Sequence, residues 1–380
     1  MRLPFASRLL IRKNKMPRNP LISVCIPSYN RPEYISDLIQ TILDQDFDDY
    51  ELIISEDNSP KTKDVESVVT RMAKKYPTKN IRFIRHPETL GYDGNFRSLI
   101  EASNGDFCVF MGDDDLLCDG ALNKIATVIK NNKELGVILR CWARADRETK
   151  EIIERYKYFE GDRTFHAGND TVVTLFRRSV AIAGYTVNRR LAKKYSTEHF
   201  DGSLLYQLYL SGMILDEAPA YYISDLIAIM RKDPDQKPTH FFGTAKAEKG
   251  KFNSGELDTN NSLNFVKGMI SIAKYLEHQP KKRQGIFRRI LRDIGNYSYP
   301  LLAPQYGQPK IKFVSYYLSL AKLGLWNNLY FHAYFYALLF IGRRRCERLI
   351  IFAKRRLGRT PLLGSLYTGA EVLPKDDAAP

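Results

Sequence analysis

The chain has few cysteines, and none are in a paired arrangement. Its 380 residues include five cysteines and six histidines, and no two cysteines are spaced as CxxC. Three of the cysteines lie inside apolar runs, which favours reduced core residues in a cytoplasmic protein over a disulfide framework. The length allows one large domain plus a smaller extension, because single cores stop growing at about 250 to 300 residues.

Long apolar runs are also missing. No window reaches the roughly 18 uncharged apolar residues that a membrane-spanning helix needs. The nearest, "LWNNLYFHAYFYALLFIG", is interrupted by Asn327, Asn328 and His332. Residues 1–20 form a basic N-terminal segment with six basic residues and no acid, but without the apolar stretch and cleavage site of a secretory signal. Attachment to a membrane surface is therefore favoured over spanning.

Acidic residues are scarce in one region only. Residues 281–360 hold 17 Lys and Arg against two acids, Asp293 and Glu347, so this segment alone accounts for the net charge of +15. The rest of the chain sums to zero. That imbalance argues against a uniformly basic nucleic-acid binder and for one region that meets an anionic surface.

From residue 21 onward, short apolar runs of strand length alternate with helical periodicities. "LISVCIPS" is followed by "RPEYISDLIQTILDQ", whose apolar residues recur at helical spacing, and the alternation continues to "LGVILRCWARA" at 135–145. Strands that are apolar throughout indicate burial on both faces. The pattern predicts an α/β fold of Rossmann-like type, a mostly parallel sheet with helices on both faces, plus a C-terminal basic helical extension.

Polar clusters follow three of the predicted strands: "PSYNR", "SEDNSP" and "GDDD". In such sheets ligands bind beyond the carboxyl ends of the strands, so these clusters should meet at one crevice. Adjacent carboxylates such as Asp113, Asp114 and Asp115 become favourable around Mg²⁺ or Mn²⁺, which prefer oxygen ligands. An EF-hand loop from Asp113 fails, because its sixth position would be Cys118 rather than glycine. An exposed acidic turn capping the next helix is the alternative.

The stretches "SVCIPSYNRPEYISDLIQTILDQDFDDYELIISEDNS" and "GYDGNFRSLIEASNGDFCVFMGDDDLL" resemble the N-terminal half of family 2 glycosyltransferases with the GT-A fold. The resemblance covers residues 21 to about 232 and is nearest to bacterial transferases of O-antigen and capsule synthesis, including the abequosyltransferase-like group. It implies transfer of a hexosyl or deoxyhexosyl group from a nucleotide-diphosphate sugar to a hydroxyl of a glycan, with inversion and with Mn²⁺ or Mg²⁺ as cofactor.

The resemblance also implies site residues. Pro27, Tyr29 and Arg31 would contact the nucleotide, as would Glu56 and Asp57 after the second strand. In the DXD motif, Asp113 would face the ribose or metal and Asp115 would bind the metal, with Asp114 as spacer beside the nucleotide. A metal belongs on the leaving diphosphate, because a divalent ion neutralises its growing negative charge.

The acceptor side is implied less completely. "FDGSLLYQLYLSG" places Asp201 on the family's catalytic carboxylate, the general base, but Phe200 where a first acid would stand. The alternative for Asp201 is a helix N-cap. Further candidates for acceptor or phosphate contacts are Gly184, His199, Arg231 and His240.

The resemblance divides the chain into a GT-A domain at 21–245, with a nucleotide-binding half at 21–118 and an acceptor-side half at 119–245. A loop or linker at 246–262 and a helical, basic region at 263–380 follow. Arginine clusters among aromatic residues in 281–360 predict a peripheral position on the inner face of the cell membrane, near a lipid-linked glycan acceptor. RNA binding has no accompanying motif here and is disfavoured. A homodimer interface is the other possibility.

Two other functions compete. A sugar-nucleotide pyrophosphorylase shares the fold class, but it should open with a Gly-rich loop after the first strand, and "CIPSYNRPE" has none. A non-catalytic membrane-associated scaffold with a degenerate transferase domain would fit the missing carboxylate at Phe200. Retention of Asp57, Asp113, Asp115 and Asp201 disfavours it.

Overall fold

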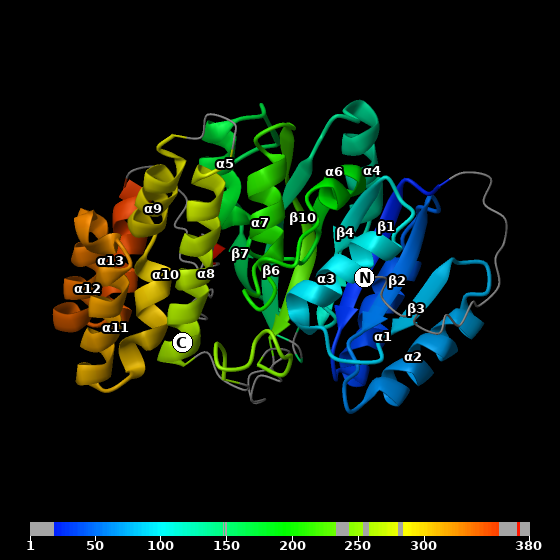
Figure 1. The fold of residues 1–380 in the computed structure, drawn as a ribbon, viewed down its shortest axis with the longest axis horizontal. Helices are drawn as coiled ribbons and strands as arrows, with labels where there is room; N and C mark the ends of the chain where they lie inside the picture. The colour runs from blue at the N-terminus through cyan, green and yellow to red at the C-terminus, as the bar shows by residue number, and fades with distance from the viewer. Residues whose placement is uncertain are drawn as a thin grey trace, which may run out of the picture.

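The structure is a computed structural model, and it describes residues 19–146, 148, 150–232, 243–253, 258–279, 284–356 and 371–372. A single sheet of eleven strands forms its centre, and helices lie on both sides of it (Figure 1). A block of helices from the C-terminal third lies at the end of the molecule opposite β2 (Tyr50–Glu56) and β3 (Ile81–Arg85).

The first part of the chain alternates strand and helix as the apolar periodicity predicts. The elements are β1 (Ile22–Ser28), α1 (Pro32–Leu43), β2, α2 (Thr62–Lys75), β3, α3 (Gly91–Ala102), β4 (Phe107–Phe110), β5 (Asp115–Leu117), α4 (Ala121–Asn131) and β6 (Val137–Asp146). Short strands and helices follow: β7 (Ile152–Tyr156), β8 (Arg163–Phe165), α5 (Asn169–Phe176), η1 (Arg177–Ser179), β9 (Tyr185–Asn188), α6 (Arg189–Lys194), α7 (Tyr206–Ile214) and β10 (Ala220–Lys232).

The rest of the described chain is almost entirely helical. It contains α8 (Thr259–Glu277), α9 (Ile286–Asn296), α10 (Tyr299–Leu302), η2 (Ala303–Gly307), α11 (Lys310–Lys322), η3 (Leu325–Asn327), α12 (Leu329–Ile341), α13 (Arg343–Arg356) and the short β11 (Glu371–Val372). The C-terminal helical extension is therefore confirmed, although its first helix begins at Thr259 rather than at 263.

The long strands of the sheet run in one direction. β3, β2, β1 and β4 are parallel neighbours, β6 and β10 form a further parallel pair, and the short β9 is inserted antiparallel between β4 and β6. Successive side chains of a strand point to opposite faces. In β1, Val24 and Ile26 join the core under α1, α2 and α4, while Cys25 joins the core under α3. The predicted α/β fold with two covered faces is confirmed.

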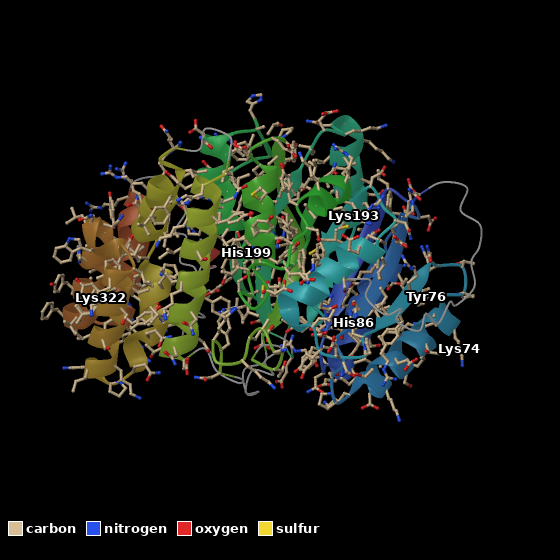
Figure 2. The ribbon with its side chains drawn as sticks, viewed as in Figure 1. Lys74, Tyr76, His86, Lys193, His199 and Lys322 are labelled. Carbon is tan, nitrogen blue, oxygen red and sulfur yellow. The ribbon has the colours of Figure 1, made fainter. Side chains whose placement is uncertain are left out.

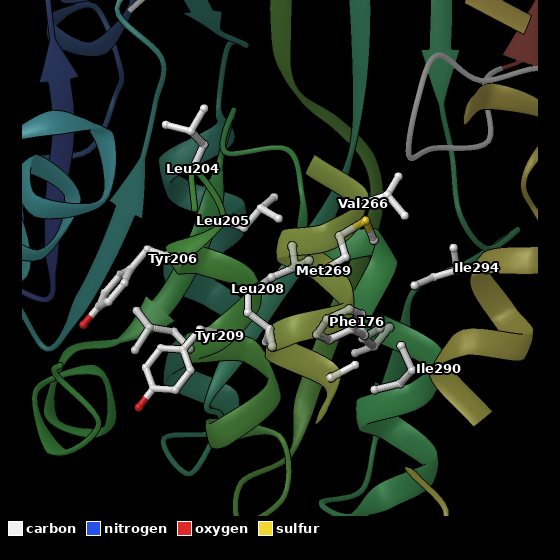
Figure 3. Close-up of a cluster of buried hydrophobic side chains, with 14 of the residues drawn as sticks. Phe176, Leu204, Leu205, Tyr206, Leu208, Tyr209, Val266, Met269, Ile290 and Ile294 are labelled. Carbon is white, nitrogen blue, oxygen red and sulfur yellow. The ribbon is translucent and has the colours of Figure 1, made fainter. Parts of the chain in front are cut away.

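The helical extension shares a core with α5 and α7. Buried residues of α7, α8 and α9 form one cluster, in which Leu208 of α7 lies near Met269 of α8, and Phe176 of α5 lies near Ile290 of α9 (Figure 3). Residues 243–253, which span the end of the predicted GT-A domain and the start of the predicted linker, pack against α3: a Cβ added at Gly91 would lie 2.7 Å from Cβ of Ala245 and 2.6 Å from Oε1 of Glu248. The C-terminal helices therefore share the hydrophobic core of the preceding part of the chain.

Among the residues that the structure describes, no helix is long and apolar enough to cross a bilayer. The basic N-terminal segment lies outside the described residues, apart from Asn19 and Pro20. All five cysteines are free, and four of them are buried.

Candidate functional site

A cavity of about 360 Å³ opens at the carboxyl ends of β1, β2 and β4. This is the edge at which a parallel sheet binds ligands, because the loops after its strands meet there. Seven residues predicted from the sequence line the cavity: Pro27, Tyr29, Arg31, Asp57, Asp113, Asp114 and Asp115. The three polar clusters at the strand ends therefore do share one crevice.

The three consecutive aspartates are held together by Arg31. Its Nη1 lies 2.9 Å from Oδ1 of Asp113 and 3.0 Å from Oδ2 of Asp114. The backbone N–H of Tyr29 donates to Asp113 at 3.1 Å, and that of Gly112 donates to Asp115 at 2.9 Å. Asn30, with a φ of 63°, makes the left-handed turn that places Tyr29 and Arg31 on this side. One guanidinium thus offsets part of the repulsion among three carboxylates.

The offset is incomplete. Burial, and then repulsion by Asp114, hold the pKa of Asp115 well above its usual range. Burial raises the pKa of Asp113 to about 6 despite the attraction of Arg31. Carboxylates with raised pKa values are stabilised by any further cation that reaches them. The triplet therefore has unused capacity for positive charge.

The donor set fits a hard divalent cation. Its free groups are carboxylate oxygens, the ligands that Mg²⁺ and Mn²⁺ prefer. Across the described part of the chain, no three acidic, histidine or cysteine side chains converge closely enough to form a cage. That is compatible with a cation held by one or two carboxylates plus phosphate and water oxygens, as is usual for Mg²⁺.

Asp57 lies at the end of the cavity next to the start of α3. Its carboxylate accepts hydrogen bonds from the backbone N–H groups of Leu90 at 2.7 Å and Gly91 at 2.8 Å. Glu248, from the segment 243–253, accepts from the next N–H group, that of Tyr92, at 3.0 Å. Burial and the nearby carboxylates raise the pKa of Asp57 to about 8. Two acids from distant parts of the chain therefore share the positive end of one helix.

Ser28 was not predicted as a separate contact, although it lies in the "PSYNR" cluster. It lines the cavity, and its Oγ is buried without a hydrogen-bond partner. A buried hydroxyl without a partner costs free energy that a ligand would recover. Tyr92 and Asn95 also line the cavity.

Glu56 does not line the cavity. It is fully buried, and its carboxylate accepts hydrogen bonds from the backbone N–H of Ser59 at 3.2 Å and from Oγ1 of Thr62 at 2.7 Å. These contacts tie the end of β2 to the start of α2. These hydrogen bonds give Glu56 a structural role, and its contact with a nucleotide stays a prediction.

Asp201 also lies outside the cavity lining. Both of its carboxylate oxygens accept hydrogen bonds from the guanidinium of Arg97 on α3, one of them at 2.8 Å. It is not the N-cap of the next helix, because α7 begins at Tyr206 with Leu205 as its N-cap residue. The predicted catalytic carboxylate is therefore held by an arginine in this structure.

The start of α7 is capped from another helix. The Asp93 carboxylate, on α3, accepts from the backbone N–H groups of Ser203 at 2.8 Å, Leu204 at 2.8 Å and Tyr206 at 3.0 Å. Burial raises the pKa of Asp93 to about 7. One face of α3 therefore fixes the whole loop from Asp201 to Tyr206.

The remaining acceptor-side candidates that the structure describes are not among the residues that line the cavity. Gly184 has a φ of 79°, and a Cβ there would lie 3.3 Å from Nε of Arg140. His199 is exposed on the loop beside α8 (Figure 2), with its ring 5.4 Å from that of Tyr275. Arg231 donates to the backbone oxygens of Asp114 at 2.7 Å and Tyr34 at 2.9 Å. Their contacts to substrate stay predictions, and His240 lies outside the described residues.

Phe200, which replaces an expected acid, packs into an aromatic cluster. Its ring lies 4.8 Å from that of Tyr209 and 5.1 Å from that of Tyr275 on α8. Aromatic pairs at such distances stabilise packing by about 0.5 to 1.5 kcal/mol beyond burial. Phe200 therefore anchors the loop to α8.

Residues 23–186 match the family model described as "Glycosyl transferase family 2". The GalNAc(5)-diNAcBac-PP-undecaprenol beta-1,3-glucosyltransferase of Campylobacter jejuni is 35% identical over 111 residues, which are 28% of this chain and 33% of that protein. Abequosyltransferase RfbV of Salmonella typhimurium is 34% identical over 145 residues, which are 34% of this chain and 43% of that protein. The chain thus spans less than half the length of either relative in these matches.

Two solved structures resemble the fold. S. aureus TarS 1–349 has a TM-score of 0.54 at 15% identity, over 80% of each chain. The same protein in complex with UDP-GlcNAc also has a TM-score of 0.54, at 14% identity, over 94% of this chain and 97% of that one. At such low identity the likeness concerns the fold alone.

Proposed function

We propose that this chain, whose residues 23–186 form a family 2 glycosyltransferase domain, transfers a sugar from a nucleotide-diphosphate donor to a hydroxyl group of a glycan, with inversion and with a divalent cation. The observation that carries the proposal is the cavity at the strand ends, where Asp57, Arg31 and the three aspartates line one space. Each is of a residue type that a nucleotide or a metal-bound diphosphate requires.

The donor would lie along the strand ends. Asp57 and Pro27 would meet the nucleoside, and Ser28 offers a buried hydroxyl without a partner beside them. Asp113 and Asp115 would hold Mn²⁺ or Mg²⁺, which neutralises the negative charge that grows on the departing diphosphate. Arg31, already paired with two of the aspartates, would keep them ordered before the cation arrives.

Asp201 is proposed as the general base that accepts the proton of the acceptor hydroxyl while that oxygen attacks the anomeric carbon. Its carboxylate would then have to turn from Arg97 toward the acceptor, because both oxygens are bonded to the arginine. The same ion pair is the observation that favours the second candidate function, a non-catalytic scaffold. In that case Asp201 and Arg97 only hold the loop to α3.

The acceptor is proposed to be a lipid-linked glycan of surface polysaccharide synthesis. This proposal is based on the names of two relatives. The Campylobacter protein is named as a glucosyltransferase acting on a PP-undecaprenol, and the Salmonella protein as an abequosyltransferase. A chain that meets such acceptors would have to work close to a bilayer surface.

The outer helices support a peripheral position on an anionic membrane. On α12, Leu329, Tyr336 and Phe340 are 80%, 51% and 78% exposed and lie on one side of a helix that has no charged residue. The neighbouring α13 contributes Arg343, Arg344, Arg345 and Arg348. Apolar residues that enter the headgroup layer beside cations, each worth about 1 kcal/mol near anionic lipid, fit this arrangement. A homodimer through the same face is the alternative.

Flotation of the full chain with vesicles tests the membrane proposal. Leu329→Ser with Phe340→Ser should reduce binding to anionic vesicles at least tenfold without changing the melting temperature, since both side chains are exposed. Deletion of the C-terminal helices is not a suitable test, because α8 and α9 share the core of the domain and their loss would disrupt it. Unchanged flotation, or loss of a dimer instead, would refute the membrane position.

Thermal shift with UDP, GDP, CDP and dTDP, each with and without Mn²⁺, tests the donor site. At least one nucleotide should raise the melting temperature more with Mn²⁺ than without, because cation and diphosphate complete each other's ligands. If none of the four does so, the proposed function fails.

A further inference from the structure

Part of the cavity lining forms an apolar wall that begins at the strand beside Asp115. Its side chains are Val180, Ala181 and Ile182, from the segment before β9, together with Leu204, Leu205 and Met230. Leu204 and Leu205 are buried in the loop that leads into α7. The wall is thus built on packed elements and is already formed without a ligand.

The wall lies beside the place where the donor's sugar would sit. Met230 of β10 stands directly opposite Asp115 of β5 in the antiparallel pair. In a nucleotide-diphosphate sugar, the sugar is bonded to the phosphate farther from the nucleoside. If Asp113 and Asp115 hold the diphosphate, the next group along the donor therefore meets Met230 and its neighbours rather than the polar strand ends.

The backbone carbonyl groups of this wall already have partners inside the protein. The oxygen of Val180 accepts from Nε2 of Gln207 at 2.6 Å. That of Ala181 accepts from Nη2 of Arg140 at 3.0 Å, and that of Ile182 accepts from the N–H of Tyr185 at 2.6 Å. Arg140, fully buried, thus serves to hold this segment in place.

The other polar groups of the wall are engaged too. The N–H of Leu204 donates to Asp93 and that of Leu205 to Oγ of Ser203 at 3.1 Å. Trp142, whose ring also lines the cavity, donates its Nε1–H to the hydroxyl of Tyr158 at 3.1 Å. Gln207 accepts from the hydroxyl of Tyr92 through Oε1 at 3.1 Å. The polar side-chain atoms on this side therefore bond to the protein itself.

A sugar hydroxyl pressed against such a wall would lose its water without gaining a partner. A sugar that carries a methyl group or a hydrogen in place of that hydroxyl avoids the loss and gains apolar contact. From this arrangement, and resting on the proposed function, we propose that the donor sugar is a deoxyhexose whose deoxy face lies against Met230, Ile182 and Leu204.

The test compares matched donors on the nucleotide that binds best in the thermal-shift series. Hexose and 6-deoxyhexose forms of the same sugar, in the gluco, galacto and manno configurations, are titrated by calorimetry in the presence of Mn²⁺. For at least one configuration the deoxy donor should bind about 10 to 100 times more tightly, the range in which apolar pockets discriminate small groups. Ratios near one in all three configurations would overturn the proposal.

Two variants and one control locate the effect. Met230→Gln and Ile182→Gln bring an amide to the wall at partly exposed positions, and at least one should reduce the deoxy preference to within about threefold. Met230→Leu keeps the wall apolar and should preserve the preference. A preference that survives both glutamine variants would show that the discrimination arises elsewhere, which overturns the assignment to this wall.

The outcome is separable from that of the proposed function. Binding of the bare nucleotide with Mn²⁺ depends on the strand-end half of the cavity alone. If the nucleotide binds and no deoxy preference appears, only the sugar assignment is wrong. If no nucleotide binds, the transferase proposal itself has failed. Tighter binding of an N-acetylhexosamine donor than of every deoxy donor would likewise refute the deoxyhexose assignment.

Discussion

The two sides of the cavity differ in how completely their polar groups are satisfied. On the strand-end side, Asp57, Asp113 and Asp115 have raised pKa values, and Oγ of Ser28 lacks a partner. On the opposite side, the carbonyl groups of 180–182 and the N–H groups of Leu204 and Leu205 all have partners within the protein. The strand-end side keeps polar groups that a ligand could satisfy, whereas the backbone groups named on the opposite side each already have a partner within the protein.

This difference indicates which side of the cavity would supply the binding free energy. Buried carboxylates that repel one another make the empty protein less stable, and a ligand with positive charge or donors relieves that cost. An apolar wall whose backbone groups already have partners contributes binding free energy only through shape complementarity and the removal of water. The strand-end side should therefore decide whether a donor binds, and the wall should decide which donor it is.

The largest expected effect concerns Asp201, which belongs to neither side. Asp201→Asn should lower kcat by about 10² to 10⁴, the usual contribution of a general base, while nucleotide affinity stays within about twofold. Initial rates of sugar transfer and calorimetric titration of the nucleotide measure the two effects. Arg97→Gln serves as the control: it breaks the same ion pair and leaves the carboxylate in place, so it should retain far more activity.

If Asp201→Asn and Arg97→Gln lose activity equally, the pair is structural and the base assignment is wrong. An Asp201→Asn protein with full activity would lead to the same conclusion.

The next largest effect concerns the strand-end side. Asp115→Asn should lower activity by about 10² to 10³, as the loss of one electrostatic group at a reacting centre usually does. It should also abolish the Mn²⁺-dependent thermal shift, yet raise the melting temperature of the empty protein, because one buried carboxylate with a strongly raised pKa is removed. Scanning calorimetry with and without nucleotide distinguishes the higher melting temperature of the empty protein from the lost nucleotide-dependent shift. A destabilised empty protein would contradict the view that this side is incomplete without a ligand.

On the satisfied side, Asp93→Ala should destabilise the protein by about 2 to 3 kcal/mol. It leaves backbone N–H groups of Ser203, Leu204 and Tyr206 buried without an acceptor. Urea unfolding measures the loss, with Asp64→Ala on the exposed face of α2 as the matched control. A loss no larger than that of the control would show that the wall does not depend on this cap.

The smallest effect is the dependence of stability on pH between about 6.5 and 8. The pKa of Asp57 is raised to about 8 in the folded protein, against about 3.9 in an unfolded chain. The folded state then holds more protons than the unfolded state in this range, so the stability of the empty protein should fall as the pH rises. Asp57→Asn should reduce the slope without removing it, because the raised pKa values of Asp93 and Asp115 contribute in the same direction.

Melting temperatures across this pH range provide the measurement. The lower limit of pH 6.5 reduces the contribution of His86. The pKa of His86 is lowered in the folded protein, so this residue makes stability rise with pH, mainly below the usual pKa of histidine. A melting temperature that rises from pH 6.5 to 8 would contradict the placement of Asp57 as a buried carboxyl.

Much of the fold and half of the site followed from local sequence. The strands around Val24 and Val109 were visible because strands buried on both faces must be apolar at every position. The polar ends of those strands then had to meet, since parallel strands end at one edge of a sheet. That is why the sequence alone predicts Asp57 and Asp113 in one crevice.

Contacts between distant segments could not be predicted in this way. Glu56 and Asp57 are neighbours with the same chemistry, yet one bonds to α2 and the other faces the cavity. Asp201 matched a motif, but its partner Arg97 lies on another helix and no periodicity relates the two. Likewise, the helical region was expected to be an appendage, and only packing showed that it shares the domain's core.

The amino-acid sequence by itself determined the alternation of strands and helices, the apolar faces and the three aspartates at a strand end, because these depend on backbone periodicity and on residue type at fixed spacing. The tertiary structure alone decided which carboxylates face the cavity, which ones cap helices and which one is paired with an arginine. The physical reason is that a buried carboxylate bonds to whatever donors packing brings within reach, and those donors can lie more than a hundred residues away in the chain, as Arg97 does from Asp201.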